Sequence, residues 1–422
     1  MTLTELDHDA ITRLHTEQQA AYAELKARGL KLDLTRGKPS AEQLDLSNAL
    51  LTLPGEDYRD AAGVDCRNYG GIEGVAELRA IFAELLGVPV EQLIAGDNAS
   101  LAIMHDTIAF ALLKGFPESA GPWAGEKIKF ICPVPGYDRH FSICEQYGIE
   151  MINVELGEHG PDLDQVRELA KDPSVRGIWA VPTYANPSGS IYSEEVTRAL
   201  VSMETAAPDF RIFWDNAYAF HHLTETDVPV LDVLGLAAEA GNPDRVLIFA
   251  STSKITFAGA GVSFFASSPA NIAWYLGLLG KRTIGPNKIN QLAHARYLGS
   301  AAGVRDLMAK HRAIIAPKFQ RAEQILHDRL DGHGVATWTE PQGGYFISLD
   351  VVDGTATRVV QLAKEAGIVM TGAGSAFPYG KDPRDRNIRI APTFPTLDDV
   401  EQAIDGLATC VLLAAAEQRL AG

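Results

Sequence analysis

The chain has 422 residues, of which 46% are hydrophobic and 22% are charged, and its formal net charge at pH 7 is −17. These fractions are typical of globular proteins, and a chain of this length is expected to form about two to three domains. The acidic balance argues against partners such as nucleic acids and anionic membranes, because proteins bind both through basic surfaces.

The four cysteines, Cys66, Cys132, Cys144 and Cys410, show no C-x-x-C spacing. In a chain of this length they predict a reduced, cytoplasmic protein with neither a disulfide framework nor a zinc site. The polar N-terminus does not resemble a signal peptide, and no apolar run reaches the roughly 20 residues of a membrane span.

Residues 5–27 are predicted to form an exposed amphipathic helix, which leads through a short extended segment into the turn Thr35-Arg36-Gly37-Lys38-Pro39. Such an arm is suited to packing on a partner subunit. We expect residues 1–45 to form an N-terminal arm that joins a small domain. Residues 46–300 would then form a large domain, and residues 301–422 the small C-terminal domain.

A loop around Tyr69 leads into a predicted helix over 75–86, and a second helix is predicted from Ala99 and Ser100 to residue 113. The first turn of a helix has unpaired N–H groups and favours negative charge. The start of the second helix is therefore a candidate anion site, with an ordinary N-cap as the alternative interpretation.

From residue 128 onward, apolar runs of strand length alternate with segments of helix length. The runs cover residues 128–132, 151–154, 177–181, 211–214 and 246–250. This alternation predicts an α/β fold in which a mostly parallel sheet is covered by helices on both faces. A further strand over 262–266 follows after about a dozen residues, which is marginal for a crossover helix, so we expect it to run antiparallel.

Ligands of such sheets bind at the carboxyl ends of the strands. Four predicted strands are followed there by side chains that can contact a ligand: Tyr137 and Arg139, then Asn186, then Asp215 and Tyr218, and finally Ser251, Ser253 and Lys254. A lysine that ends a buried strand between hydroxyls and glycines is a candidate Schiff-base nucleophile, because partial burial favours the neutral amine. The alternative is a lysine in a surface loop.

Helices over 274–296 and 302–330 are predicted to lead from the sheet to a smaller α+β domain. That domain would hold strands within 334–338, 343–349 and 387–390 and a helix over 356–366.

In order and placement, these motifs resemble the fold-type I, pyridoxal-phosphate-dependent aminotransferases of the class I aspartate aminotransferase family, and more narrowly the divergent actinobacterial subgroup. The resemblance runs from Leu34 to the C-terminus. It implies a large domain around a sheet of the seven-stranded type and a homodimer with shared active sites. It also implies a ping-pong transfer of the amino group between aspartate or glutamate and 2-oxoglutarate or oxaloacetate.

The resemblance assigns the cofactor contacts residue by residue. Lys254 would form the Schiff base and then move the α-proton, while Asp215 would keep the pyridine nitrogen protonated and so make the ring an electron sink. Asn186 and Tyr218 would donate to the phenolic oxygen of the cofactor, and Tyr137 would stack on its ring.

The phosphate would be bound by Ala99 and Ser100 at their helix start and by Ser251 and Ser253. Tyr69, in the motif N-Y-x-x-I-x-G, matches a tyrosine that the family supplies from the neighbouring subunit.

For the substrate, Arg389 in N-I-R-I matches the arginine that binds the α-carboxylate, and Gly37 matches the glycine whose backbone approaches the same group. A dicarboxylic substrate needs a second cation, because an unpaired buried charge is costly. We expect Arg139 to fill this role, with Arg36 as the competing choice.

The chain departs from the family at the arginine that usually follows the lysine and binds the phosphate. Here residues 259–262 read Gly-Ala-Gly-Val, and Lys288 is the candidate replacement. Lys281 and Arg282 lie near the usual position of the distal-carboxylate arginine, although the local pattern does not match.

Three alternatives remain. The first two are an aminotransferase that prefers aromatic, kynurenine-like or alanine donors, and a lyase on the same cofactor. The third is a non-catalytic regulator, which is disfavoured because only a short acidic segment precedes the matching region.

Overall fold

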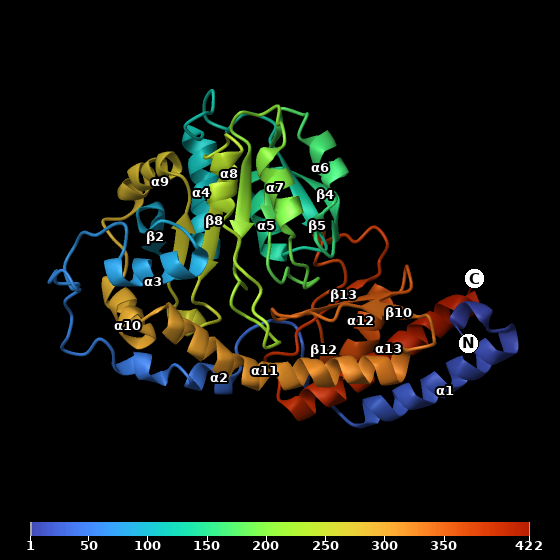
Figure 1. Cartoon of the computed structure of the whole chain (residues 1–422). Helices are drawn as coiled ribbons and strands as arrows, with labels where there is room; N and C mark the ends of the chain where they lie inside the picture. The colour runs from blue at the N-terminus through green and yellow to red at the C-terminus, as the bar shows by residue number, and fades with distance from the viewer. Residues whose placement is uncertain (1, 422) are drawn as a thin grey trace.

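An eight-stranded sheet forms the centre of the protein in the computed structural model, which describes residues 2–421 (Figure 1). Its strand order is β2-β9-β8-β7-β6-β3-β4-β5. In chain order the strands are β2 (Leu93–Gly96), β3 (Lys129–Val134), β4 (Glu150–Gly157), β5 (Gly160–Pro161), β6 (Val175–Ala180), β7 (Arg211–Asp215), β8 (Val246–Ser251) and β9 (Ser263–Ala266).

Strands β4, β3, β6, β7 and β8 are mutually parallel, whereas β9 pairs antiparallel with both β8 and β2. The mostly parallel sheet and the antiparallel last strand are both confirmed. The eighth strand is the two-residue β5, which folds back on β4 and extends the seven-stranded arrangement.

The inner strands β3, β6, β7 and β8 are mostly apolar because both of their faces are buried. Successive residues of a strand point to opposite faces. Accordingly Ile212 and Trp214 of β7 belong to one apolar cluster, and Phe213 between them belongs to another. This explains why the runs appear as continuous hydrophobic stretches rather than alternating ones.

Eight helices accompany the sheet in this part of the described chain: α3 (Ala76–Leu86), α4 (Ser100–Lys114), α5 (Asp138–Tyr147), α6 (Leu163–Leu169), α7 (Glu194–Ser202), α8 (Val233–Glu239), α9 (Pro269–Arg282) and α10 (Lys288–Leu298). The prediction of a single helix over 274–296 is wrong, because α9 and α10 are separate helices. Between them lie Gly285 and Pro286, and proline both lacks an N–H group and disfavours helical backbone in the residue before it.

The 30-residue helix α11 (Ala301–Leu330) connects the sheet to the rest of the chain (Figure 1). Val304 and Leu307 in its first half pack in a cluster against the sheet, whereas Phe319 and Leu326 pack in a second core. One helix therefore contributes to two hydrophobic cores, as expected for a connecting element.

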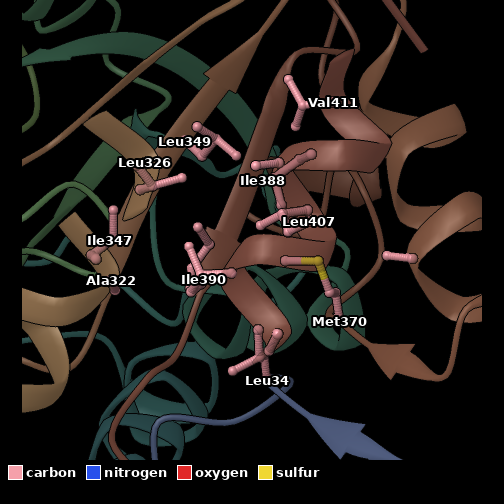
Figure 2. Packing of buried hydrophobic residues seen from close by; sticks show 14 of the residues in the cluster. Leu34, Ala322, Leu326, Ile347, Leu349, Met370, Ile388, Ile390, Leu407 and Val411 are labelled. Atoms are coloured by element: carbon pink, nitrogen blue, oxygen red, sulfur yellow. The ribbon is translucent and has the colours of Figure 1, made fainter. Parts of the chain in front are cut away.

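The second core is built on a three-stranded antiparallel sheet of β10 (Ala336–Trp338), β11 (Ile347–Val351) and β13 (Asn387–Ile390). Helices α12 (Ala356–Glu365) and α13 (Leu397–Ala421) pack with it, and α13 was not among the predicted elements. Figure 2 shows the packing, with Leu349 and Ile388 from the sheet beside Leu326 of α11 and Leu407 of α13.

The N-terminal arm packs on this second core within the same chain. Helix α1 (His8–Ala27) lies along α13 (Figure 1), and Tyr22 Oη donates a hydrogen bond of 3.0 Å to the carbonyl of Leu362. Strand β1 (Leu32–Asp33) pairs in parallel with β12 (Ile368–Val369), and the short helix α2 (Ala41–Asp45) follows. The arm thereby places residues 35–38 beside the carboxyl ends of the central strands.

Across residues 2–421, no helix combines the length and apolar character that crossing a membrane requires.

Candidate active site

A cavity of about 780 Å³ opens where the carboxyl ends of the central strands face the N-terminal arm and the three-stranded sheet. It brings together eight of the side chains and backbone sites predicted from the sequence: Arg36, Gly37, Tyr137, Arg139, Asn186, Tyr218, Lys254 and Arg389. Thr35, Lys38, Asp138, Phe346 and Thr371 complete its lining.

Lys254 lies in the turn that follows β8. The Thr252 carbonyl accepts hydrogen bonds from the N–H groups of Ile255 and Thr256, both of 2.9 Å, which fixes the backbone around the lysine. Its Nζ lies 4.8 Å from the centroid of the Tyr218 ring, and no described carboxylate pairs with it. The amine is thus held at the cavity wall without a counter-ion, as a nucleophile requires.

Asp215, at the end of β7, is 2% exposed. Its Oδ2 accepts a hydrogen bond of 2.9 Å from Nε2 of His140, whereas its Oδ1 is buried without a hydrogen-bond partner in the described chain. Buried carboxylate oxygens are rarely left unpaired, so a ligand with an N–H group fits this position. A protonated pyridine nitrogen is such a donor, and the observation therefore fits pyridoxal phosphate.

His140 was not among the predicted site residues. Its ring stacks on Trp179 at a centroid distance of 4.3 Å and an interplanar angle of 9°, which fixes its orientation toward Asp215. The sequence contained a signal for His140. Tyr137 is the N-cap of α5, and His140 follows it by three positions, a spacing that places two residues on the same face of a helix.

Of the two phenols of the cavity, Tyr218 is buried and Tyr137 is partly buried. Burial raises the pKa of Tyr137 to about 12 and raises that of Tyr218 well above its ordinary value. Both hydroxyls therefore stay protonated at neutral pH and can donate hydrogen bonds to a ligand.

Arg389 projects from β13 and is only 8% exposed. Its Nη1 donates to Asp138 Oδ1 at 2.8 Å and to Asn186 Oδ1 at 3.4 Å, and its Nη2 donates to Thr371 Oγ1 at 3.5 Å. A planar guanidinium with fixed donors is suited to binding a carboxylate. Asp138, an acidic residue in the first turn of α5, was not among the predicted site residues.

Gly37 packs directly on the ring of Phe346. A Cβ atom at this position would lie 2.4 Å from Cζ of Phe346, so only glycine fits. The contact explains the glycine by packing, and Gly37 also lines the cavity.

Five cations line the cavity, namely Arg36, Lys38, Arg139, Lys254 and Arg389, against the single carboxylate of Asp138. Within residues 2–421, Arg36, Lys38 and Arg139 form no ion pair, and Lys38 Nζ lies 3.9 Å from the centroid of Phe394. An excess of positive charge inside a concave site favours anionic ligands.

The predicted phosphate ligands lie outside the lining of this cavity. Ala99 is the N-cap of α4 and Ser100 its first residue, while Ser251 Oγ donates a hydrogen bond of 3.1 Å to Ser253 Oγ. Gly261 lies between the start of α4 and the turn after β8. A Cβ atom at this position would lie 2.8 Å from the carbonyl oxygen of Asn98 and 3.4 Å from Oγ of Ser253.

Tyr69 is 82% exposed and lies away from the cavity of its own chain. Its carbonyl accepts a hydrogen bond of 3.3 Å from Nζ of Lys288, so this lysine faces the loop around Tyr69. Arg282 pairs with Asp97 at 2.7 Å and with Asp106 at 2.8 Å, and its charge is therefore already balanced.

Comparison with known proteins agrees with this geometry. The family described as aspartate amino-transferase matches residues 6–422. An aspartate aminotransferase of Corynebacterium glutamicum is 57% identical over 419 residues, which cover 99% of this chain and 97% of that protein. The crystal structure of an aspartate transaminase from the same species superposes with a TM-score of 0.98 at 56% identity and covers 99% of each chain.

A more distant structure shares the fold alone. LysN, the α-aminoadipate aminotransferase of Thermus thermophilus, superposes with a TM-score of 0.72 at 21% identity, covering 94% of this chain and 95% of that one. That enzyme was crystallised as a complex with N-(5'-phosphopyridoxyl)-L-leucine. Together with the match over nearly the whole sequence, these findings mean that the chain belongs to the aspartate aminotransferase family.

Proposed function

We propose that this protein is a pyridoxal-phosphate-dependent aspartate transaminase. The observation that carries the proposal is the arrangement at the carboxyl end of the sheet. Lys254 without a counter-ion and Arg389 line one cavity, and Asp215 with its unpaired buried oxygen ends β7, the strand beside the β8 that Lys254 follows.

The residues around the cavity would hold the cofactor from several sides. Lys254 Nζ would bind it covalently, and Asp215 Oδ1 would accept a hydrogen bond from its ring nitrogen, with His140 fixing the carboxylate. Tyr218 and Asn186 would donate to its phenolic oxygen, and Tyr137 would lie against its ring. When bound, the cofactor supplies an electron sink for the charge that develops at the substrate Cα.

The phosphate would lie at the start of α4, where Ala99 and Ser100 offer backbone N–H groups and a hydroxyl, with Ser251 and Ser253 opposite. Residues 259–261, which follow Lys254, contain no arginine that could bind the phosphate. We propose that the positive charge of Lys288, whose Nζ contacts the loop around Tyr69, compensates the phosphate instead.

The remaining groups act on the substrate. Arg389 would bind the α-carboxylate through its guanidinium, and Gly37 would approach the same group through its backbone. Lys254 Nζ would take the proton from Cα of the donor and, in the second half of the reaction, deliver a proton to Cα of the new amino acid. Arg139 would bind the distal carboxylate, with Arg36 as the rival.

The exposure of Tyr69 supports a role in the site of a second subunit, and we propose a homodimer with shared active sites. Mixing Lys254→Ala protein with Tyr69→Phe protein tests this role, because each heterodimer regains one intact site. Activity that does not rise after confirmed subunit exchange would rule out action in trans.

We also propose the division into an arm of residues 1–45, a large domain of residues 46–300 and a small domain of residues 301–422. The separate apolar clusters on the sheet and on β10, β11 and β13 support it. A cytoplasmic location is proposed because Cys66, Cys132, Cys144 and Cys410 are all free and buried.

The test is a panel of amino donors given to the holoenzyme with 2-oxoglutarate, with Lys254→Ala as the inactive reference. Aspartate and glutamate should convert the cofactor absorbance between its two transaminase forms, while alanine and aromatic donors react more slowly. Preference for an aromatic or kynurenine-like donor would replace the proposed specificity. Release of ammonia without a cofactor cycle would indicate a lyase.

A further inference from the structure

The carboxylate-binding arginine of the cavity already holds a carboxylate of its own chain. Asp138 Oδ1 accepts a hydrogen bond of 2.8 Å from Nη1 of Arg389. The arginine side chain is 8% exposed and the aspartate side chain 35%, so the pair is partly shielded from water. Asp138 is also the only acidic residue among the described residues that line the cavity.

We propose that Asp138 is an internal competitor, which occupies Arg389 in the substrate-free protein and is displaced by the incoming α-carboxylate. The proposal rests on the role assigned to Arg389 under the proposed function. It makes the affinity for every carboxylate ligand a difference between two ion pairs, one formed with the ligand and one lost with Asp138.

The donors of Arg389 explain why both carboxylates do not bind together. Its Nη1 donates to Asp138 Oδ1 at 2.8 Å, and its Nε is buried without a hydrogen-bond partner within the described chain. A carboxylate that binds end-on, through one hydrogen bond from each terminal nitrogen, needs Nη1 as well as Nη2. Asp138 occupies Nη1, and two like charges held at one partly buried guanidinium repel each other.

The cavity offers a place for the displaced side chain. Arg36, Lys38 and Arg139 line the same cavity and form no ion pair with any residue that the structure describes. Asp138 also lies in the first turn of α5, where the helix dipole stabilises its negative charge. Asp138 therefore stays close to cations after it leaves Arg389, which makes the exchange reversible.

The direction in which carboxylate affinity changes on removal of the Asp138 charge distinguishes a competitor from a residue that supports Arg389. If Asp138 competes, removing its charge strengthens the binding of any carboxylate. If Asp138 instead orients Arg389 for the substrate, removing its charge weakens binding. A partly exposed ion pair lies between the surface and buried extremes, so we expect dissociation constants to fall about tenfold.

Succinate is a suitable probe, because it carries two carboxylates but no amino group and needs no turnover. Its binding to the holoenzyme would be measured by calorimetry for the wild type, Asp138→Asn and Asp138→Ala. The asparagine keeps an oxygen that can accept from Nη1 of Arg389 and removes only the charge. Asp164→Asn is the matched control, since Asp164 lies in the first turn of α6 and its side chain is 97% exposed.

Both Asp138 variants should bind succinate about tenfold more tightly, and the control should bind it as the wild type does. KM for aspartate should fall in Asp138→Asn while kcat does not rise, because the change acts before the chemical step. Thermal unfolding without ligand establishes that the variants are folded at the temperature of the titration.

Unchanged or weaker succinate binding in Asp138→Asn would overturn the proposal. Its failure is distinct from a failure of the proposed function. An enzyme that transaminates aspartate normally but shows no gain in succinate affinity refutes only the competitor. A protein that gains succinate affinity but transaminates no donor leaves the competitor standing and refutes the transaminase assignment.

Discussion

Replacing Arg139 with leucine tests how the protein would select dicarboxylic substrates. Arg139 follows Asp138 in the first turn of α5, lines the cavity and forms no ion pair within residues 2–421. An unpaired cation at a binding cavity contributes little to the free protein, so its loss should leave folding nearly unchanged. Its effect should appear only with a substrate that carries a second carboxylate.

The magnitude depends on whether water leaves the site when the substrate binds. A solvent-exposed ion pair contributes at most about 1 kcal/mol, whereas leaving a desolvated carboxylate without its partner costs about 2–4 kcal/mol. We expect the larger value, because the substrate would lie between the arm, α5 and β13, which surround the cavity. In kcat/KM this corresponds to a loss of about 30- to 700-fold.

The assay compares kcat/KM for aspartate, glutamate and alanine in the wild type and in Arg139→Leu. Aspartate and glutamate should lose activity by the stated factor, and alanine should be nearly unaffected. Arg36→Leu and Lys38→Leu are the matched variants, since both cations line the same cavity without an ion pair. Equal losses for all three donors would refute the assignment, and a selective loss in Arg36→Leu alone would transfer the role to that residue.

Two further predictions concern the buried polar groups beneath the cavity. Asp215→Ala should retain some cofactor but lose most of its activity, because the ring nitrogen would lose its carboxylate partner; wild-type turnover would contradict this role. Burial lowers the pKa of His221 from 6.5 to about 3. Between these two pH values the histidine is protonated in the unfolded chain and neutral in the folded protein. Unfolding free energy should therefore fall by about 2 kcal/mol between pH 7.5 and pH 5, and His221→Gln should flatten this dependence in thermal unfolding; an unchanged pH dependence in that variant would contradict the prediction.

The inner strands β3, β6, β7 and β8 of the central sheet could be predicted from the sequence because each is buried on both faces. A strand of this kind needs an unbroken apolar run, and such runs are visible without knowledge of their neighbours. Strand β13 was predicted at its observed limits of Asn387–Ile390. Since the carboxyl ends of parallel strands share one edge, placing Asn186, Tyr218 and Lys254 in one cavity also followed from the order of the strands.

Helix boundaries were less predictable where one apolar periodicity runs across a break. Residues on both sides of Gly285-Pro286 have buried apolar faces, as Leu279 of α9 and Leu292 of α10 show. Periodicity alone joins them into one helix, and only the proline marks the break. The breaker signal should therefore have outweighed the periodic one.

The contacts that distinguish this site could not be predicted, because they join segments that are far apart in the chain. Asp138 and Arg389 are separated by 251 positions, and His140 and Asp215 by 75. Arg389 and Asp215 were predicted as site residues, but Asp138 and His140 lie at a helix start, where a sequence pattern assigns polar residues equally well to a cap or a solvated surface. What selects them is the start of α5 at Asp138, which directs Asp138 and His140 to different partners within one helical turn. Asp138 reaches the guanidinium proposed to bind the substrate, and His140 reaches the carboxylate proposed to bind the cofactor. A shift of this helix would therefore alter both contacts together, which couples the two halves of the site through a single turn of α5.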